Sequence, residues 1–255
     1  MVVYSFNTGR NLQVFQGFGV TAFTSALGNP VILQSIQVSL IISAGSAVVS
    51  TILGTFAGIA LGRRPGRWAP PLLVVLGLVL VTPEIVNALS LLPWFVSLGV
   101  NANIAIFNNG FVRLIVAVSL FAATLVTFIV RSRVAGMDAS LEEAAADLYA
   151  PPLRRFTSVT LPVIRPAVIS GALLAFTVSL DETVIASFVS VAGTTPWPVY
   201  IFSATRAALR PEVAAMSTLV LVLTLAVLGV VVLVLRRSSG GEVGGTAQLA
   251  RDLVG

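Results

Sequence analysis

Residues 137–168 read MDASLEEAAADLYAPPLRRFTSVTLPVIRPAV. They form a polar segment between two long apolar runs. Ser140 and Glu143 have the spacing of a capping box, in which each side chain bonds an unpaired amide at a helix start. One narrow apolar stripe of helical period follows, formed by Leu141, Ala144, Ala145 and Leu148. The proline pair at 151–152 disfavours helix in the residues before it, so the helix should end near Tyr149. The pattern predicts a short amphipathic helix in a loop outside a membrane.

The rest of the chain is strongly apolar. Of its 255 residues 56% are hydrophobic and only 10% are charged, and the mean hydropathy is +0.99. Soluble domains carry about 25% charged residues, so this composition indicates a membrane protein. Long segments contain no charged side chain, namely residues 11–62, 85–112, 114–130, 183–205 and 213–235. Because about 20 apolar residues cross the hydrocarbon core, each of these segments is long enough to contain or complete a span.

An all-α membrane protein with five transmembrane helices is therefore expected. The predicted spans are residues 33–62, 70–97, 112–131, 164–190 and 213–235. Pro83 and Glu84 interrupt the second span, and Asp181 and Glu182 interrupt the fourth. The transmembrane domain then covers residues 1–237, with the polar loop at 137–166. The Gly/Ser-rich end, residues 238–255, is predicted to be a disordered cytoplasmic tail.

Arginines set the expected orientation, because short cytoplasmic loops collect positive charge. If the loop at 63–69 is inside, eleven arginines lie on the inner side: Arg63, Arg64, Arg67, Arg131, Arg133, Arg154, Arg155, Arg165, Arg236, Arg237 and Arg251. The outer side then has four, which are Arg10, Arg113, Arg206 and Arg210. This asymmetry predicts a multi-pass protein of the cytoplasmic membrane with a cytoplasmic loop at 137–166 and a cytoplasmic C-terminus.

Missing residue types exclude several kinds of chemistry. The chain has no cysteine, no histidine and no lysine, which excludes disulfides, zinc sites of the usual ligands and a phosphate-binding loop of the Walker A type. We therefore expect no catalytic residue, no metal and no cofactor in this chain, and an energy source in another subunit. The net charge of +5 needs no nucleic-acid partner, because the arginines lie at the ends of the predicted spans.

The loop at 137–166 resembles the EAA loop of ABC importer permeases, in which two short helices dock on an ATPase subunit. The matching positions are Glu143, Ala144, Ala145, Ala150, Leu161 and Pro162. Tyr149 stands where that family has glycine, a residue that allows a left-handed turn; here the proline pair at 151–152 is expected to make the break. The resemblance implies three kinds of protein partner: a homologous second permease, two copies of an ATPase subunit and an extracytoplasmic substrate-binding protein.

Other stretches resemble the second permease subunit of spermidine/putrescine importers. They are SFNTGR at 5–10, TPEIVNALSLL at 82–92, and SLDETVIASFVSVAG, PVYIFSATR and PEVAAMSTL between 179 and 219. The resemblance implies a six-helix permease fold whose first helix is missing or truncated ahead of residue 5, and a polyamine substrate. Iron, sugar and sulfate permeases share the same scaffold and stay open as alternatives. A secondary transporter is a further alternative, but such a protein has no use for an ATPase-docking helix.

Charged residues inside the predicted spans are candidates for a substrate path. Asp181, Glu182 and Glu84 are acidic, the only bases within the spans lie at span ends (Arg113, Arg131 and Arg165), and intramembrane charges are costly enough to suggest function. They would suit a cationic substrate; alternatively they cap broken helices. Arg206 and Arg210 lie in the expected outer loop, where the resemblance implies docking of a binding protein, although they are equally consistent with ordinary solvated charges.

Overall fold

A computed structural model of the chain describes residues 2–9, 14–63, 65–207, 210–227 and 229. Within these ranges the protein is all-helical, apart from one isolated bridge between Asn7 and Phe18. Four helical segments are long and apolar enough to cross a membrane: Pro30–Arg63, Glu84–Asn101, Gly110–Ala135 and Pro152–Leu180. Two shorter apolar helices accompany them, Ala69–Val81 and Pro211–Val227. The predicted tail at 238–255 and the end of the fifth predicted span lie outside the described residues.

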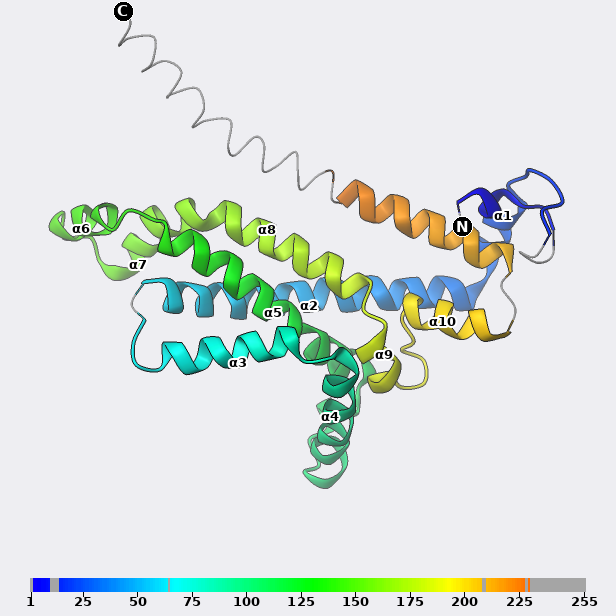
Figure 1. The fold of residues 1–255 in the computed structure, drawn as a ribbon, viewed down its shortest axis with the longest axis horizontal. Helices are drawn as coiled ribbons and strands as arrows, with labels where there is room; N and C mark the ends of the chain where they lie inside the picture. The colour runs from blue at the N-terminus through cyan, green and yellow to red at the C-terminus, as the bar shows by residue number, and fades with distance from the viewer. Residues whose placement is uncertain (1, 10–13, 64, 208–209, 228, 230–255) are drawn as a thin grey trace, which may run out of the picture.

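Three long helices form the centre of the molecule (Figure 1). They are α2 (Pro30–Arg63), α5 (Gly110–Ala135) and α8 (Leu161–Leu180), which pack against one another. Asparagine caps start two of them: Asn29 Oδ1 accepts the amide of Val31 at 3.1 Å, and Asn109 Oδ1 accepts the amide of Phe111 at 2.9 Å. Each cap satisfies an amide that the first helical turn leaves unpaired.

Small residues allow α2 and α5 to approach closely. Glycines at a spacing of four on α2 face valines at the same spacing on α5: Gly54, Gly58 and Gly62 against Val126, Val130 and Val134. Buried serines add polar contacts to other helices, with Ser50 Oγ donating to Ser119 O at 3.1 Å. The hydrophobic effect does not drive helix association in lipid, so the close van der Waals packing along such small-residue contacts holds the helices together instead.

We expect Gly58→Ala to destabilise the packing of α2 against α5. An added Cβ at this position would lie 2.8 Å from Val130 Cβ and 2.9 Å from Thr127 O, so the helices must separate, at a cost of about 1–3 kcal/mol. A lower melting temperature in detergent would show it. Gly77→Ala on α3 is the matched control, since no atom lies within 4 Å of an added Cβ, and its melting temperature should stay the same or rise. Equal effects of the two substitutions would contradict the tight seam.

The second predicted span is two helices with a sharp change of direction. The first, α3 (Ala69–Val81), ends before Thr82 and Pro83, and the second, α4 (Glu84–Val96), starts directly after them. Proline cannot donate a helical hydrogen bond and disfavours helix in the preceding residue. Figure 1 shows α4 turned across the direction of α3 and projecting from the bundle. The interruption predicted at Pro83 and Glu84 is therefore present, and the chain changes direction there.

The fourth predicted span is interrupted as expected. Helix α8 ends at Leu180, and α9 (Val184–Val189) follows after Asp181–Thr183. Beyond it, α10 (Trp197–Ala207) and the helix Pro211–Val227 return to the start of α2. There Trp197, Val213 and Met216 form one buried cluster with Ile32 and the short helix α1 (Thr21–Gly28). This cluster and the loop at 137–160 lie at opposite ends of the bundle (Figure 1).

Candidate functional site

The loop at 137–160 contains three short helices at one end of the bundle. They are α6 (Ser140–Asp147), α7 (Pro152–Arg155) and η4 (Phe156–Thr160), and η4 continues into α8. A π-helical turn such as η4 is common where helical hydrogen bonds are interrupted, and Pro162 interrupts them by lacking a donor. Leu161 packs on the core of α2, α5 and α8, while Pro162 is exposed. The sequence therefore correctly predicts a short helix in this loop.

The start of α6 differs from the predicted capping box. Asp138 Oδ1 accepts the Ser140 amide at 2.9 Å, and Ala139 already has helical dihedral angles, φ −64° and ψ −27°. Asp138 therefore caps the helix, and no capping hydrogen bond from Ser140 forms. The Ser140 hydrogen bonds hold the pKa of the Asp138 carboxyl below its ordinary value. Since the charged form is favoured in the folded loop, this contribution to helix stability is present above the carboxyl's unfolded pKa and is lost at lower pH.

The end of α6 corrects a second expectation. Tyr149 has a positive φ of 56°, so it adopts the left-handed turn itself instead of leaving the break to the prolines. Its amide donates to Ala146 O at 2.9 Å, and the Ala150 amide donates to Ala145 O at 3.1 Å. These two bonds form a Schellman motif, whose left-handed position usually carries glycine. The loop geometry expected for glycine is therefore retained with tyrosine, at about 1–2 kcal/mol of backbone strain.

We expect Tyr149→Gly to stabilise the end of α6 by about 1 kcal/mol, because glycine occupies positive φ without steric cost. Slower hydrogen exchange of the backbone amides of residues 149 and 150 would show this stabilisation, since both amides donate the hydrogen bonds of the motif. Tyr149→Val should have the opposite effect on exchange, because a β-branched residue is strained at positive φ. Faster exchange in Tyr149→Gly than in the wild type would contradict this reading of the turn.

The predicted apolar stripe of α6 has no partner within the described chain. No residue of α6 is buried; Leu141 is 47% exposed and Leu148 is 82% exposed. Ala144 is exposed and Ala145 half-buried. Tyr149 and Leu153, which follow α6 in the same loop, are also exposed, at 96% and 76%. We call Leu141, Ala144, Ala145, Leu148, Tyr149 and Leu153 the α6 face.

The opposite side of α6 lines a cavity of about 790 Å³ between the loop and the ends of α2 and α5. Glu143 is exposed and lies at this cavity together with Glu142. Glu142 forms an ion pair with Arg63 at the end of α2, and its Oε1 accepts a hydrogen bond from Thr160 at 2.7 Å. The sequence pattern assigns a role to Glu143 and none to Glu142. A basic residue at the end of the first span is the available signal for this pairing.

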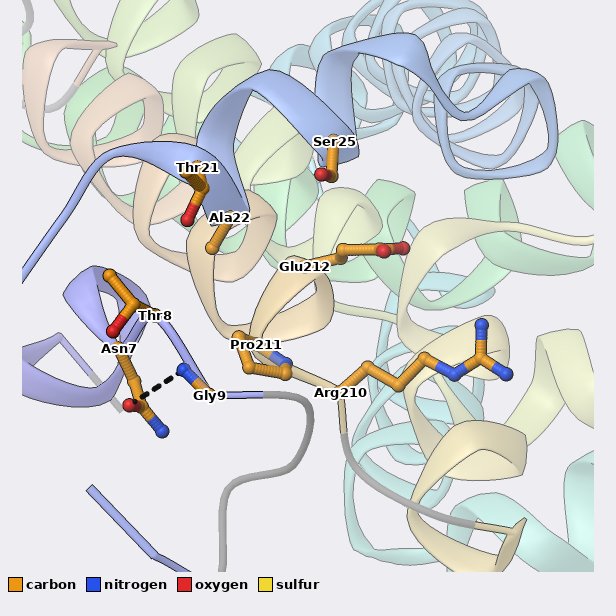
Figure 2. A pocket seen from close by; sticks show the side chains of 9 residues that line it. All are labelled: Asn7, Thr8, Gly9, Thr21, Ala22, Ser25, Arg210, Pro211 and Glu212. Carbon is orange, nitrogen blue, oxygen red and sulfur yellow. Dashed lines mark hydrogen bonds between the residues drawn. The ribbon is translucent and has the colours of Figure 1, made fainter. Parts of the chain in front are cut away.

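The outer pair Arg206 and Arg210 does not form one cluster. Arg206 lies on α10, with its guanidinium carbon 4.7 Å from the centre of the Phe202 ring. Arg210 lies ahead of the helix Pro211–Val227 and lines a cavity of about 470 Å³. Figure 2 shows the other lining side chains, which are mostly polar and include Asn7, Thr21 and Glu212. This cavity lies at the end of the bundle opposite α6.

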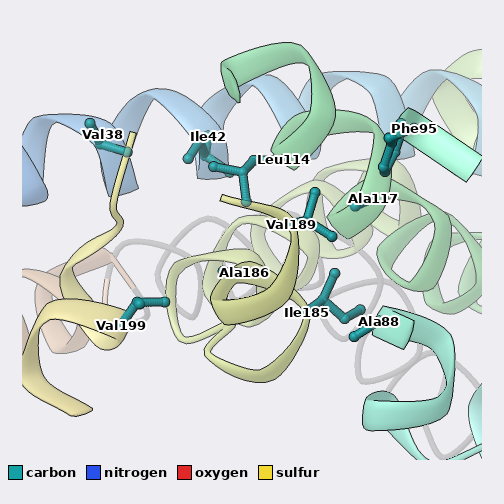
Figure 3. Packing of buried hydrophobic residues seen from close by; sticks show 10 residues of the cluster. All are labelled: Val38, Ile42, Ala88, Phe95, Leu114, Ala117, Ile185, Ala186, Val189 and Val199. Atoms are coloured by element: carbon teal, nitrogen blue, oxygen red, sulfur yellow. The ribbon is translucent and has the colours of Figure 1, made fainter. Parts of the chain in front are cut away.

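The three intramembrane acids gather where two broken helices meet. Helix α4 packs on α9, and Figure 3 shows Ala88 of α4 beside Ile185 of α9 in the buried cluster. Glu84 is the first residue of α4, directly before this contact, and Asp181 and Glu182 directly precede α9. The two helix breaks that carry these acids therefore lie next to each other.

The three acids differ in how far their side chains are exposed. Glu182 is 7% exposed, and its Oε1 accepts the Ile185 amide at 2.9 Å, so it caps the start of α9. Asp181 and Glu84 are exposed. The helix-capping alternative thus describes Glu182, whereas the other two carboxylates remain accessible at the break.

Comparison with known families identifies the chain. Residues 50–239 match the family of binding-protein-dependent transport system inner membrane components. The chain belongs to this family. It is therefore a transmembrane permease component and not an enzyme, and the ATPase of such a system is a separate subunit.

Two relatives are similar along most of the permease. The putrescine transport system permease protein PotI of Escherichia coli is 39% identical over 224 residues, which are 87% of this chain and 79% of PotI. The spermidine/putrescine transport system permease protein PotC of Haemophilus influenzae is 34% identical over 239 residues, which are 94% of this chain and 90% of PotC.

Solved structures share the fold of this permease. A chain of the MetNI methionine ABC transporter in an inward-facing conformation superposes with a TM-score of 0.67 at 15% identity, covering 81% of this chain and 95% of that one. A chain of a bacterial ABC transporter involved in alginate import gives 0.60 at 14% identity, covering 94% and 86%. The all-helical architecture with candidate membrane spans is thus that of ABC importer permeases.

Proposed function

We propose that this permease is the second membrane subunit of an ABC importer for polyamines such as putrescine and spermidine. Its relatives PotI and PotC carry those substrates in their names, at 39% and 34% identity. The accessible carboxylates of Asp181 and Glu84 are consistent with a cationic substrate. A homologous permease completes the path, two ATPase subunits drive it, and an extracytoplasmic binding protein delivers the substrate.

The α6 face is the proposed ATPase-docking surface, and it is the observation that carries the function. Its apolar side chains belong to a polar loop outside the proposed spans, where the described part of the chain leaves them exposed. Small alanines at 144 and 145 allow the helix to sit deep in a groove. Glu143 is exposed on the cavity side of α6, and its carboxylate is proposed to pair with a basic residue of the ATPase.

The proposed topology has five spans: α2, α3 with α4, α5, α8 with α9, and the helix that begins at Pro211. The described arginines support an inner side at the α6 end. The ends of α2, α5 and α8 next to α6, with the loops beside them, carry Arg63, Arg67, Arg131, Arg133, Arg154, Arg155 and Arg165, whereas Arg113 lies near the start of α5 and Arg206 and Arg210 lie at and after the end of α10. This distribution follows the positive-inside rule and gives a cytoplasmic C-terminus. Because the ATPase uses cytoplasmic ATP, it can dock at α6 only if α6 lies on the cytoplasmic side of the membrane.

Asp181 and Glu84 are proposed to line the substrate path. An accessible carboxylate facing lipid would cost about 2.5–3.5 kcal/mol on insertion scales, so both should face water or the partner permease. A polyamine ammonium that leaves bulk water there gains a counter-charge. At the outer end, Arg206 and the cavity beside Arg210 are proposed to receive acidic residues of the binding protein.

Deleting the gene for this permease tests the function directly. Uptake of labelled putrescine by the cells should fall to background and return when the permease is expressed from a plasmid. Unlabelled spermidine should compete with putrescine, whereas sugars, sulfate and chelated iron should not. Unimpaired polyamine uptake together with lost uptake of one of those other solutes would overturn the polyamine assignment and keep the importer class.

A further inference from the structure

Three side chains from three segments meet at the end of the bundle that carries α6. Arg63 is the last residue of α2, Glu142 lies in the first turn of α6, and Thr160 is the last residue of η4. Arg63 forms an ion pair with Glu142 and also donates a hydrogen bond to Thr160 Oγ1. The Thr160 hydroxyl in turn donates to Glu142 Oε1 at 2.7 Å. A single hydroxyl thus accepts from the cation and donates to the anion.

The surroundings make this contact stronger than an ordinary surface ion pair. Thr160 is fully buried, and the Arg63 and Glu142 side chains are only 30% and 27% exposed. Partial burial reduces the screening that makes exposed pairs weak. The hydrogen bonds to the hydroxyl also fix the geometry of both charged groups.

Other contacts hold α6 only weakly to the spans. Helix α6 packs mainly on α7 and η4, which belong to the same loop, and none of its side chains is buried. A large cavity separates its inner side from the ends of α2 and α5. The contact of Glu142 with Arg63 is therefore a direct side-chain link across this space from α6 to a membrane-spanning helix.

The helix at the other end of this link reaches the far side of the molecule. With 34 residues, α2 is about 51 Å long at ~1.5 Å per residue. It packs on α5 and α8 along its length, and on α1 and α10 near its start. The tight glycine seam with α5 limits bending of α2, so a displacement at Arg63 moves the helix as a rigid element.

We propose that the Arg63–Glu142–Thr160 contact is the strut through which a displacement of α6 is transmitted to α2. Glu142 is a positioning residue in this role, because it contacts neither substrate nor ATP. The inference rests on the proposed docking of an ATPase at the α6 face, and it adds the element that converts docking motion into rearrangement of the spans. Two adjacent glutamates then have different roles, since Glu142 transmits the displacement through Arg63, whereas the exposed Glu143 is the one proposed to pair with the ATPase.

Glu142→Gln tests the strut in the complete transporter reconstituted in liposomes. The variant removes the charge with little change of size, so the ATPase should still co-purify in wild-type amounts and basal ATP hydrolysis should stay within about twofold. Putrescine transported per ATP hydrolysed should fall at least tenfold, because the cation link is lost. Asp147→Asn is the matched control, since it removes a charge from the exposed end of the same helix, and its transport per ATP should not change.

The charge swap Arg63→Glu with Glu142→Arg distinguishes the pair from a merely structural role. Each single reversal should uncouple transport, and the double variant should restore at least a third of the wild-type ratio of transport to hydrolysis. A swap that stays as uncoupled as the single variants, or normal coupling in Glu142→Gln, would overturn the strut. Loss of the ATPase from Glu142→Gln would do so as well, by placing Glu142 in docking. If the wild-type complex itself holds no ATPase, the proposed function fails instead.

Discussion

Replacing Leu148 by aspartate should release the ATPase subunits from the purified complex and abolish ATP-driven uptake. Leu148 is 82% exposed in the permease alone, so the substitution removes no internal packing. In the docked state, a leucine of this kind contributes about 1.5–3 kcal/mol of burial, and a carboxylate there must also be desolvated. The affinity for the ATPase should therefore fall at least a hundredfold, since about 1.4 kcal/mol is a factor of ten.

Ala145→Asp should have the same effect, because Ala145 lies on the same α6 face. Ser158→Asp is the matched control: it adds the same charge to an exposed position of the same loop, outside α6. Pull-down of the ATPase by the tagged permease, with a melting curve for each variant, separates docking from folding. If Leu148→Asp retains the ATPase as well as Ser158→Asp does, the α6 face is not the docking surface.

Neutralising Asp181 and Glu84 together should reduce polyamine uptake at least tenfold while the complex stays assembled. An opposite charge 4 Å from an ammonium contributes about 4 kcal/mol at an effective dielectric constant of ~20. Removing two such carboxylates from the path needs to alter the transport barrier by only ~1.4 kcal/mol to give a tenfold change. Asp181→Asn and Glu84→Gln keep side-chain size, and neither carboxylate is buried, so the melting temperature should move little.

Glu182 provides the comparison for this experiment. Its amide replacement, Glu182→Gln, still offers an oxygen to the Ile185 amide and should preserve the start of α9. Glu182→Ala removes that acceptor and should lower the melting temperature, by about 1 kcal/mol of stability. Putrescine uptake in vesicles is measured together with the melting temperature of each variant. Normal uptake in the Asp181 and Glu84 variants would contradict their assignment to the substrate path. Uptake that falls only in proportion to the loss of thermal stability would also contradict it.

Much of the fold can be predicted from the sequence because its causes are local. Long uncharged runs predict spans, and proline or paired acids inside them predict the breaks after Val81 and Leu180. The short helix α6 follows from its period and from the prolines after it. The direction of α4 does not, because a helix break shows where the chain turns and not the angle at which it continues.

The details of the site depend on contacts that are distant in sequence or on single dihedral angles. The ion pair of Glu142 joins residues 63 and 142, a separation that no local pattern encodes. The positive φ of Tyr149 is hard to predict because tyrosine seldom occupies that region, and the prolines offer a simpler explanation. The cap at Asp138 is hidden because Ser140 and Glu143 match a capping box two residues later.

ATP dependence of polyamine uptake distinguishes an ATPase-driven importer most directly from a carrier driven by an ion gradient. The permease is reconstituted with its partner permease and ATPase in liposomes, binding protein and labelled putrescine are added outside, and ATP is enclosed. Uptake should require enclosed ATP and binding protein, and should stop with a non-hydrolysable analogue. Putrescine accumulation that follows an ion gradient and is indifferent to ATP would contradict an ATPase-driven importer.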